Sequence, residues 1–310
     1  MGIPEVSATQ LPKREPSSKA QTTMSRESGP KAVAKRILGY AVLIFFALVF
    51  IMPFVLSAAT AFKSLPDIQA NPVSLVADPA FGGWTTEGIE NLNSSRVNLP
   101  RWTLNSVIVT VFVVLLRITF GSLAGYALAR MRFPGRGWIF ALVLAVQAVP
   151  GIVLAVPRFM VMKELGILNT YAGMIIPLAF DAFGIFLMKQ FFEQLPRELE
   201  EAAALDGAST WGTFRHVMLP LAAPGLIALT ILSTQGTWNE FLHILIARIG
   251  NPDLTTLPVG LAGLTAAFGE AQPWNTITAG ALVTIIPIAI VFFVFQRYFV
   301  QGTAASAIKG

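Results

Sequence analysis

The polar stretch Glu200-Glu201-Ala202-Ala203-Ala204-Leu205-Asp206-Gly207, followed after nine residues by Val217-Met218-Leu219-Pro220, decides how this chain folds. It is short, charged and rich in alanine, and it separates two long apolar segments. Pro196 suits the first position of a helix, and Glu198 then falls in the first turn, where the helix dipole favours an acid. Gly207 suits the C-terminal stop of this helix.

A second helix is expected to follow directly. Ser209 can cap it, and we expect it to run towards Leu219 until Pro220 breaks it. The loop 194–222 is therefore predicted to be a helix–turn–helix. Ala202, Ala203 and Ala204 are expected to give it a small-residue surface that a partner backbone can approach closely, with Glu201 free for a charge-assisted bond. The alternative is an ordinary surface helix in which Glu201 pairs with Arg197.

The composition around this loop is that of a polytopic membrane protein. Of 310 residues 54% are hydrophobic and 13% charged, and the mean hydropathy is +0.65. Cysteine is absent, which excludes disulfides, thiolate metal sites and a cysteine nucleophile. His216 and His243 are too few for a histidine metal cluster, and His243 is expected to be a packed side chain rather than a proton carrier. The net charge of +5 reflects membrane topology rather than nucleic-acid binding.

Apolar segments long enough to cross a bilayer, which takes about 20 residues, predict an all-α membrane protein with six transmembrane helices. The candidate spans are 37–62, 104–128, 138–161, 171–192, 223–247 and 274–299. A cleaved signal peptide is the alternative for the first span, but its apolar stretch and its polar lead are too long. Small residues in the second span are expected to let helices approach closely, and they are Gly121, Ser122, Ala124, Gly125, Ala127 and Ala129.

Lys and Arg concentrate on one side of these spans, which predicts that both termini are cytoplasmic. Of the 22 basic residues, only Lys63, Arg96, Arg101, Lys163 and Arg248 fall in the segments on the opposite side, and Arg117 and Arg158 fall within spans. Residues 1–36 are polar and are expected to be a disordered cytoplasmic tail. The six-helix transmembrane domain is then 37–300, and 301–310 is a cytoplasmic tail. The outer loop 63–103 is expected to be irregular with short helical pieces.

Polar side chains within apolar spans are candidates for a solute pathway, because they are costly there unless they face a cavity or a partner. They are Gln147, Asp181, Gln235, Asn239 and Glu240, with Trp238 beside the last pair. Sugars suit this mixture of aromatic rings and hydrogen-bonding groups. The alternative is that these side chains only hold helices together, and Asp181 is then expected to pair with Arg117 or Arg158.

The chain has no phosphate-binding loop of its own, because no lysine follows a glycine. An energised transporter built on it must take its power stroke from a partner. A membrane enzyme is one rival interpretation, but it needs a cluster of acids, metal ligands or a nucleophile with its base. A stand-alone secondary transporter is the other rival, and such proteins tend to show internal repeats, of which none is evident.

The loop has a specific spacing: Glu-Ala-Ala, three residues, Gly, nine residues, an aliphatic residue, one residue and Leu-Pro. With this spacing the chain resembles the permease subunits of bacterial ATP-binding-cassette importers of the binding-protein-dependent carbohydrate type. More narrowly, the chain resembles the maltose-permease G-subunit-like group. The resemblance covers nearly everything after residue 37, although Ser306 stands where the family usually has glycine. Its other motifs are Asn105-Ser106, Ala124-Gly125-Tyr126-Ala127-Leu128-Ala129-Arg130, Arg132-Phe133-Pro134-Gly135-Arg136, Pro150, Leu165-Gly166-Ile167-Leu168-Asn169-Thr170, Trp238-Asn239-Glu240-Phe241, Thr256-Leu257-Pro258-Val259-Gly260 and Ile308-Lys309-Gly310.

This resemblance implies a type I importer permease fold in the bacterial inner membrane and a transport subunit that is not an enzyme. It implies that the loop is a coupling helix docked on an ATPase subunit, with the coupling role on Glu201, Ala202, Ala203, Asp206, Gly207 and Pro220. The implied partners are a second homologous permease, two ATPase subunits that bind ATP and Mg, an extracytoplasmic binding protein and membrane lipid, but no nucleic acid. The expected solute is a carbohydrate, with glycerol phosphate or another polyol as the alternative.

Overall fold

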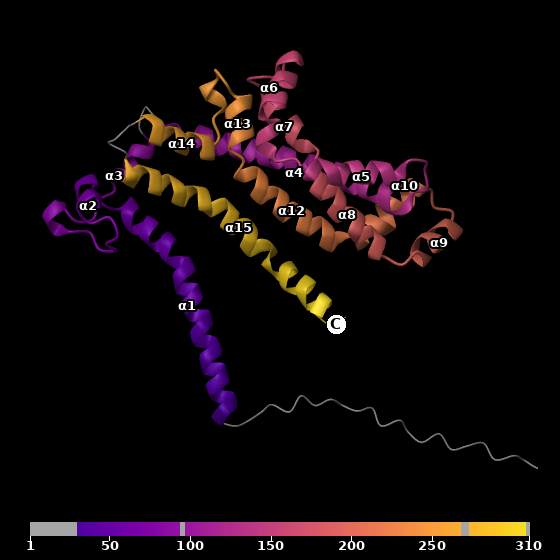
Figure 1. The fold of residues 1–310 in the computed structure, drawn as a ribbon, viewed down its shortest axis with the longest axis horizontal. Coiled ribbons are helices and arrows are strands. Elements are labelled where there is room, and N and C mark those ends of the chain that lie inside the picture. Colours follow the sequence, from indigo (N-terminus) through magenta and orange to yellow (C-terminus); the bar gives the residue numbers. More distant parts are fainter. Residues whose placement is uncertain (1–29, 94–96, 268–272, 308–310) are drawn as a thin grey trace, which may run out of the picture. The chain divides into compact units, whose positions relative to one another are not determined.

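The computed structural model describes residues 30–93, 97–267 and 273–307 of the chain, and every regular element in these ranges is helical (Figure 1). The α-helices are α1 (Pro30–Ala61), α2 (Leu65–Ala70), α3 (Glu87–Glu90), α4 (Leu99–Arg130), α5 (Arg136–Gln147), α6 (Ala155–Glu164), α7 (Tyr171–Ala179), α8 (Ala182–Gln194), α9 (Glu198–Leu205), α10 (Thr210–Thr213), α11 (Leu219–Leu221), α12 (Ala223–Trp238), α13 (Leu242–Ala247), α14 (Leu257–Ala267) and α15 (Trp274–Ala307). Short 3₁₀ turns are η1 (Pro79–Phe81), η2 (Asn91–Asn93), η3 (Gly151–Leu154) and η5 (Pro252–Leu254), and η4 (Phe214–Met218) is a π-helical turn.

The chain divides within α1 into two compact units, Met1–Met52 and Pro53–Gly310. In the first unit the described residues form the apolar N-terminal part of α1. Of the predicted tail 1–36, residues 1–29 lie outside the described residues and residues 30–36 form the first turns of α1. The second unit holds all the other helices, and at its end α15 continues through the predicted tail as far as Ala307.

Three helices of the described chain are long and apolar enough to cross a membrane, and the number rises to six if each bent helix pair forms one span. The long ones are Val33–Ala61, Leu99–Arg130 and Trp274–Phe295. The predicted spans 37–62, 104–128 and 274–299 correspond to α1, α4 and α15. The apolar composition of the sequence thus locates the straight helices correctly.

The other three predicted spans are not continuous helices in the structure. Residues 138–161 form α5 and then η3 with α6, at an angle of 98°, because Pro150 lacks an N–H and disfavours helical backbone just before it. Residues 171–192 form α7 and α8, bent by 41° at Phe180. Residues 223–247 form α12 and α13, separated by a break at Asn239–Phe241.

Helix α4 is the central element of the second unit, because α7, α8, α12 and α14 all pack against it (Figure 1). The α4–α8 crossing is very close, since a Cβ on Gly125 would lie 2.7 Å from the Met188 Cβ and 2.9 Å from the Lys189 N. Gly121, Ser122 and Gly125 are all buried. The predicted close approach of helices at these small residues is therefore confirmed.

Buried apolar side chains form three clusters that involve α4 at different heights. The first joins α4 to α7 and α13 through Val109, Val113, Met174 and Ile244. The second packs Trp102 against Trp238 and Leu257. The third surrounds Tyr126 with Met188, Phe192, Phe214 and Met218.

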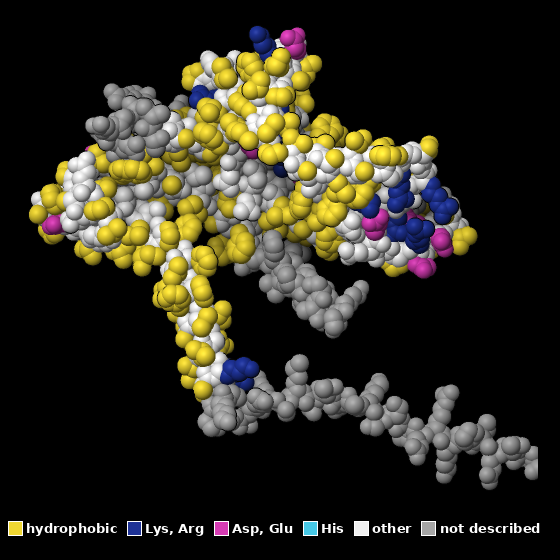
Figure 2. All heavy atoms as spheres, viewed as in Figure 1, with side chains coloured by type: hydrophobic (Ala, Val, Ile, Leu, Met, Phe, Trp, Pro, Cys, Tyr) yellow, Lys and Arg dark blue, Asp and Glu magenta, His cyan; other side chains and the backbone are white. Residues whose placement is uncertain are grey.

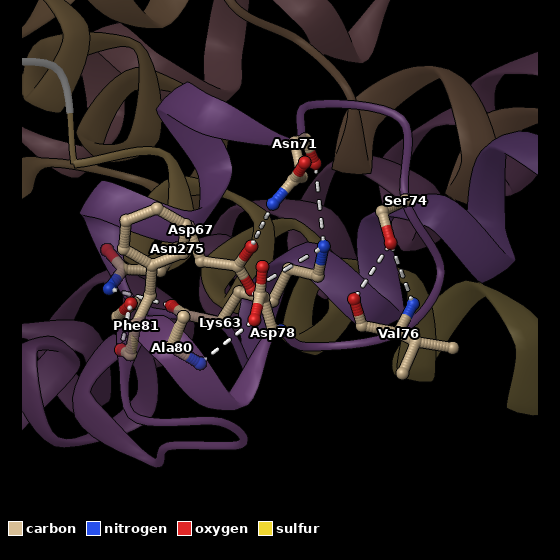
Figure 3. A network of polar contacts seen from close by, with 10 residues as sticks. Lys63, Asp67, Asn71, Ser74, Val76, Asp78, Ala80, Phe81 and Asn275 are labelled. Carbon is tan, nitrogen blue, oxygen red and sulfur yellow. Dashed lines mark hydrogen bonds and ion pairs between the residues drawn. The ribbon is translucent and has the colours of Figure 1, made fainter.

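The loop between α1 and α4 contains α2, η1, α3 and η2, which confirms the predicted irregular loop with short helical pieces. A buried ion pair organises it: the Lys63 Nζ lies 3.7 Å from an Asp67 carboxylate oxygen, and the side chains are 1% and 0% exposed. Figure 3 shows the Asp67 carboxylate also accepting from the Asn71 amide and the Asp78 backbone N–H, at 3.1 and 3.0 Å. Asn275 at the start of α15 donates to the Lys63 carbonyl oxygen, 3.4 Å away, and fixes the loop to that helix.

Candidate functional site: the α9 loop and the broken spans

The predicted helix–turn–helix of loop 194–222 is present. Its first helix, α9, begins at Glu198, two residues later than Pro196 suggested, because Arg197 takes the N-cap position. It ends in a double hydrogen bond: the Gly207 N–H bonds the Ala204 carbonyl at 3.0 Å, and the Ala208 N–H bonds the Ala203 carbonyl at 2.9 Å. This stop requires a left-handed residue, and Gly207 has φ +80°, which confirms the predicted role of this glycine.

The second helix begins as predicted but does not end at Pro220. The Ser209 Oγ accepts from the Gly212 N–H at 3.1 Å and caps α10. The helix then widens into the π turn η4, where the Leu219 N–H bonds the Phe214 carbonyl, and it continues through Pro220 in α11. Proline is tolerated there because it stands in the first turn after the widened segment. The bend of 74° comes two residues later, between Leu221 and α12.

Helix α9 has one outward and one inward face. The outward face carries Glu198, Glu201, Ala202 and Leu205, all exposed, and the side chain of Leu205 is 91% exposed. Ala203 is on the inward face and is only 9% exposed, so it does not belong to the small-residue surface that Ala202 and Ala204 form. No ion pair between Glu201 and Arg197 is found in the described chain, and Glu201 is therefore available to a partner.

The inward face of α9 is held by a group of residues that the sequence interpretation did not select. The Glu200 carboxylate accepts from the Tyr126 hydroxyl at 3.0 Å and pairs with the Arg130 guanidinium at 3.3 Å. Tyr126 and Arg130 lie one turn apart at the end of α4, so their spacing placed them on one helix face. Only the fold showed that Glu200 is opposite them. In Figure 2 charged side chains of both signs gather over α9 and α10.

The polar residues predicted for a pathway fall into two groups. Asp181 and Glu240 cap the second halves of broken spans: Asp181 accepts from the Gly184 N–H and Glu240 from the His243 N–H, each at 3.0 Å. Trp238 is buried, and its indole N–H donates to the Thr284 carbonyl at 3.1 Å. Trp238 thus joins α12 to α15, whereas the bonds of Asp181 and Glu240 are local to the helices that they cap.

Gln147, Gln235 and Asn239 form the second group, and their residues are exposed. Gln147 is the last residue of α5, before the 98° bend. Gln235 and Asn239 lie one turn apart on α12, next to the exposed Gly236. Exposed polar groups in an apolar helix are tolerated only towards a water-filled cavity or a partner chain.

Arg117 is half-buried and borders this exposed face, and the sequence interpretation had placed it only as an ion-pair partner. Its guanidinium Nε donates to the Leu178 carbonyl at 2.7 Å, and its NH1 lies 4.0 Å from the position of a Cβ on Gly236. The predicted Asp181–Arg117 ion pair is not formed, because Asp181 caps α8 and Arg117 bonds the backbone at the α7–α8 break. Both acids, Asp181 and Glu240, still interact electrostatically with Arg117, as does Arg158 with opposite sign.

The Asn105-Ser106 motif anchors the segment between α13 and α14. The Asn105 amide donates to the carbonyls of Asp253 and Thr255, both at 2.7 Å, and its oxygen accepts from the Tyr171 hydroxyl at 2.6 Å. The Ser106 hydroxyl accepts from the Leu257 N–H at 2.9 Å. These bonds explain why two polar residues are found near the start of the apolar helix α4.

The apolar helices, their breaks and the exposed polar helix–turn–helix define a helical membrane transport component. Residues 117–304 match the family model for the binding-protein-dependent transport system inner membrane component, and the chain belongs to this family. It is thus an inner-membrane transport component rather than an enzyme.

Known relatives cover almost the whole chain. It is 34% identical over 287 residues to the arabinooligosaccharides transport system permease protein AraQ of Halalkalibacterium halodurans, which covers 93% of this chain and 100% of AraQ. It is 31% identical to the trehalose/maltose transport system permease protein MalG of Thermococcus litoralis, covering 90% and 98%. It is 32% identical to the sn-glycerol-3-phosphate transport system permease protein UgpE of Escherichia coli, covering 87% and 94%.

A solved structure shares the fold. A chain of a bacterial ABC transporter involved in the import of the acidic polysaccharide alginate superposes with a TM-score of 0.71 and 24% identity, covering 87% of this chain and 98% of that chain. The chain therefore has the all-helical fold of an ABC importer permease.

Proposed function

We propose that this chain is the permease subunit of an ATP-driven importer that carries a carbohydrate delivered by an extracytoplasmic binding protein. The observation that carries the proposal is the exposed outward face of α9. This face lies outside the apolar helices of a chain that belongs to this transport family. The assembly would contain a second homologous permease and two ATPase subunits that bind ATP and Mg. This chain would bind neither.

In this proposal α1, α4 and α15 act together with the three broken segments α5–α6, α7–α8 and α12–α13 as six spans. Both termini and the loop 194–222 would then lie in the cytoplasm, in agreement with the distribution of Lys and Arg. The bent pairs α5–α6 and α7–α8 are each apolar enough, taken together, to support this topology. The segment 248–257, anchored by Asn105, would lie on the opposite side and face the binding protein.

The outward face of α9 would dock in a groove of the ATPase subunit. Its exposed Leu205 would fill an apolar pocket, and Glu201 would form a charge-assisted bond with a basic side chain. The Gly207 stop would fix the angle at which the helix projects. Asp206 is the C-cap of this helix and Pro220 lies in α11 at the end of the loop, and both would shape the loop.

The exposed face of Gln235 and Asn239, with Arg117 beside it, would line the solute path or meet the second permease. Arg117 is balanced by the two capping acids, which favours an uncharged polyhydroxyl solute. The names of AraQ and MalG refer to sugar transport, and they support a carbohydrate. The second candidate is glycerol phosphate, favoured by the relative UgpE and by the presence of both Arg117 and Arg158 within apolar helices.

Co-purification and uptake test the proposal. The tagged chain should isolate a second permease and two ATPase subunits, and proteoliposomes of this assembly should take up labelled sugar only with ATP and binding protein. Glu201→Lys should leave the chain inserted but release or uncouple the ATPase, whereas Glu164→Lys on α6 should not. Solute transport by this chain without an ATPase would contradict the proposal.

A further inference from the structure

We infer that Glu200, Tyr126 and Arg130 form a mechanical link that makes α9 and α4 move as one body. This inference rests on the proposed docking of α9 on an ATPase subunit, and it assigns a positioning role to residues that do not touch that partner. The three residues are called the α9–α4 link below.

Both carboxylate oxygens of Glu200 take part in the link, and they have different partners. One accepts from the Tyr126 hydroxyl at 3.0 Å, and the other lies 3.3 Å from the Arg130 guanidinium. A bifurcated contact of this kind fixes the orientation of the carboxylate as well as its position. Glu200 stands on the inward face of α9, so it leaves the outward docking face unchanged.

The link is rigid on the α4 side because Arg130 is also tied to the end of α8. Its Nε donates to the Phe192 carbonyl at 3.0 Å, and its NH2 donates to the carbonyls of Phe192 and Leu195. These carbonyls lie at the end of α8, where the Phe192 carbonyl also accepts from the Leu195 N–H at 3.2 Å. The side chain of Arg130 is only 5% exposed, and one guanidinium therefore joins the ends of α4 and α8 to α9.

Packing keeps Tyr126 in place independently of its hydroxyl. Its ring lies 5.5 Å from the Phe192 ring in an edge-on arrangement and 5.0 Å from the Phe214 ring. Phe214 belongs to the π turn that follows α10, so the same aromatic group also contacts the second helix of the loop. Tyr126→Phe would therefore remove the bond to Glu200 and keep the aromatic packing.

Helix α4 offers a direct route from this link to the far end of the unit. Its 32 residues span about 48 Å, and Asn105 and Ser106 near its other end hold the segment 253–257. Arg117 in its middle contacts the α7–α8 break. A displacement of α9 passed to α4 would thus reach both the broken spans and the segment proposed to face the binding protein.

Transport stoichiometry in proteoliposomes tests the link with variants that keep the shape of the side chains. Glu200→Gln and Tyr126→Phe should still co-purify with the ATPase subunits, but uptake per ATP hydrolysed should fall by about tenfold, within the range usual for coupling between sites. Glu200→Asp, which keeps the charge, should recover part of this loss. Glu164→Gln is the matched control and should behave as the unaltered chain.

A distance measurement separates the link from a purely structural role. The chain has no cysteine, so Leu199→Cys on α9, which is not one of the outward-face residues, and Leu115→Cys on α4 would be its only thiols for spin labels. With Glu200 intact, the distance between the labels should stay single and unchanged between nucleotide-free and ATP-bound assemblies. With Glu200→Gln it should broaden or change with nucleotide.

Three outcomes are distinguishable. Unchanged stoichiometry and an unchanged label distance in Glu200→Gln would overturn the link. A loss of ATPase co-purification in Glu200→Gln would also overturn it, because Glu200 would then act in docking. Full uptake and full co-purification in both Glu201→Lys and Gly207→Pro would instead contradict the proposed docking of α9.

Discussion

His243 on α13 donates its Nε2 hydrogen to the Gly173 carbonyl of α7, 3.0 Å away. Pro177 has no N–H, so this carbonyl lacks the partner that residue 177 would supply in a regular helix. A carbonyl can only accept, which fixes the hydrogen on Nε2. His243 is 2% exposed, and the bond joins two of the broken spans. The expectation that His243 is a packed side chain is confirmed.

His243→Phe should lower the free energy of unfolding in detergent by about 1–3 kcal/mol, because it leaves the Gly173 carbonyl buried without a partner. Thermal or denaturant unfolding of the purified chain measures this loss. His216→Phe is the control, since the His216 ring is exposed and bonds only its own helix at the Gly212 carbonyl. Equal stability of the two variants would contradict the role of His243.

Gly125→Ala should separate α4 from α8 and cost about 1–3 kcal/mol through overpacking. The added Cβ would meet the Met188 Cβ at 2.7 Å and the Lys189 backbone nitrogen at 2.9 Å, and backbone cannot move aside cheaply. Gly137→Ala is a matched control, because a Cβ on Gly137 meets nothing within 4 Å. Melting temperatures of both variants in the same detergent give the comparison.

Asn105→Ala should loosen the segment between α13 and α14. It removes two 2.7 Å bonds to the carbonyls of Asp253 and Thr255, with an expected loss of about 1–3 kcal/mol per carbonyl left unpaired. Limited proteolysis should cut this segment faster in the variant. Gln69→Ala, at an exposed amide, should leave the digestion pattern unchanged, and identical digestion of Asn105→Ala would show that the anchor is dispensable.

The loop between α1 and α4 should lose stability in acid. The backbone N–H of Asp78 holds the pKa of Asp67 below its ordinary value of 3.8, and Asn71 and Lys63 act in the same direction against the effect of burial. A lowered folded-state pKa contributes stability that is present above the unfolded value and disappears as the pH falls through the folded one. Stability should therefore be flat from pH 7 to about 5 and fall below about pH 4.

Asp67→Asn should abolish this acid-dependent step and lower stability at neutral pH, because the buried Lys63 loses its counter-ion. Unfolding measured from pH 7 down to acid pH, with Asp253→Asn as an exposed control, tests it. An Asp67→Asn curve parallel to that of the unaltered chain would assign the acid step to other carboxylates.

Asn239→Ala and Arg117→Gln should change solute affinity or uptake rate, since both side chains belong to the exposed face of α12 and α4. Trp238→Phe should instead lower stability by about 0.5–1.5 kcal/mol, because it loses the bond to the Thr284 carbonyl. Uptake curves and melting temperatures distinguish the two effects. Unchanged uptake curves in both Asn239→Ala and Arg117→Gln would show that this face has only a structural role.

The sequence alone predicted the features that depend on neighbouring residues. Apolar length located the straight helices α1, α4 and α15, because a span needs only enough consecutive apolar residues. Gly207 and Ser209 gave the turn of the loop correctly, since helix stops and caps depend on residues a few positions apart. Gly125 indicated a close helix contact but not the helix that it contacts.

Tertiary structure decided everything that depends on partners distant in the chain. It supplied partners for carbonyls of α7 before the α7–α8 break, since Arg117 bonds the Leu178 carbonyl and His243 bonds the Gly173 carbonyl from other helices. It placed the Trp238 indole at the Thr284 carbonyl and the Asp181 and Glu240 carboxylates at the starts of α8 and α13, and it brought Glu200 to Tyr126 and Arg130. A local pattern shows that a side chain is polar or faces inward, but only the packed fold supplies the atom that it bonds.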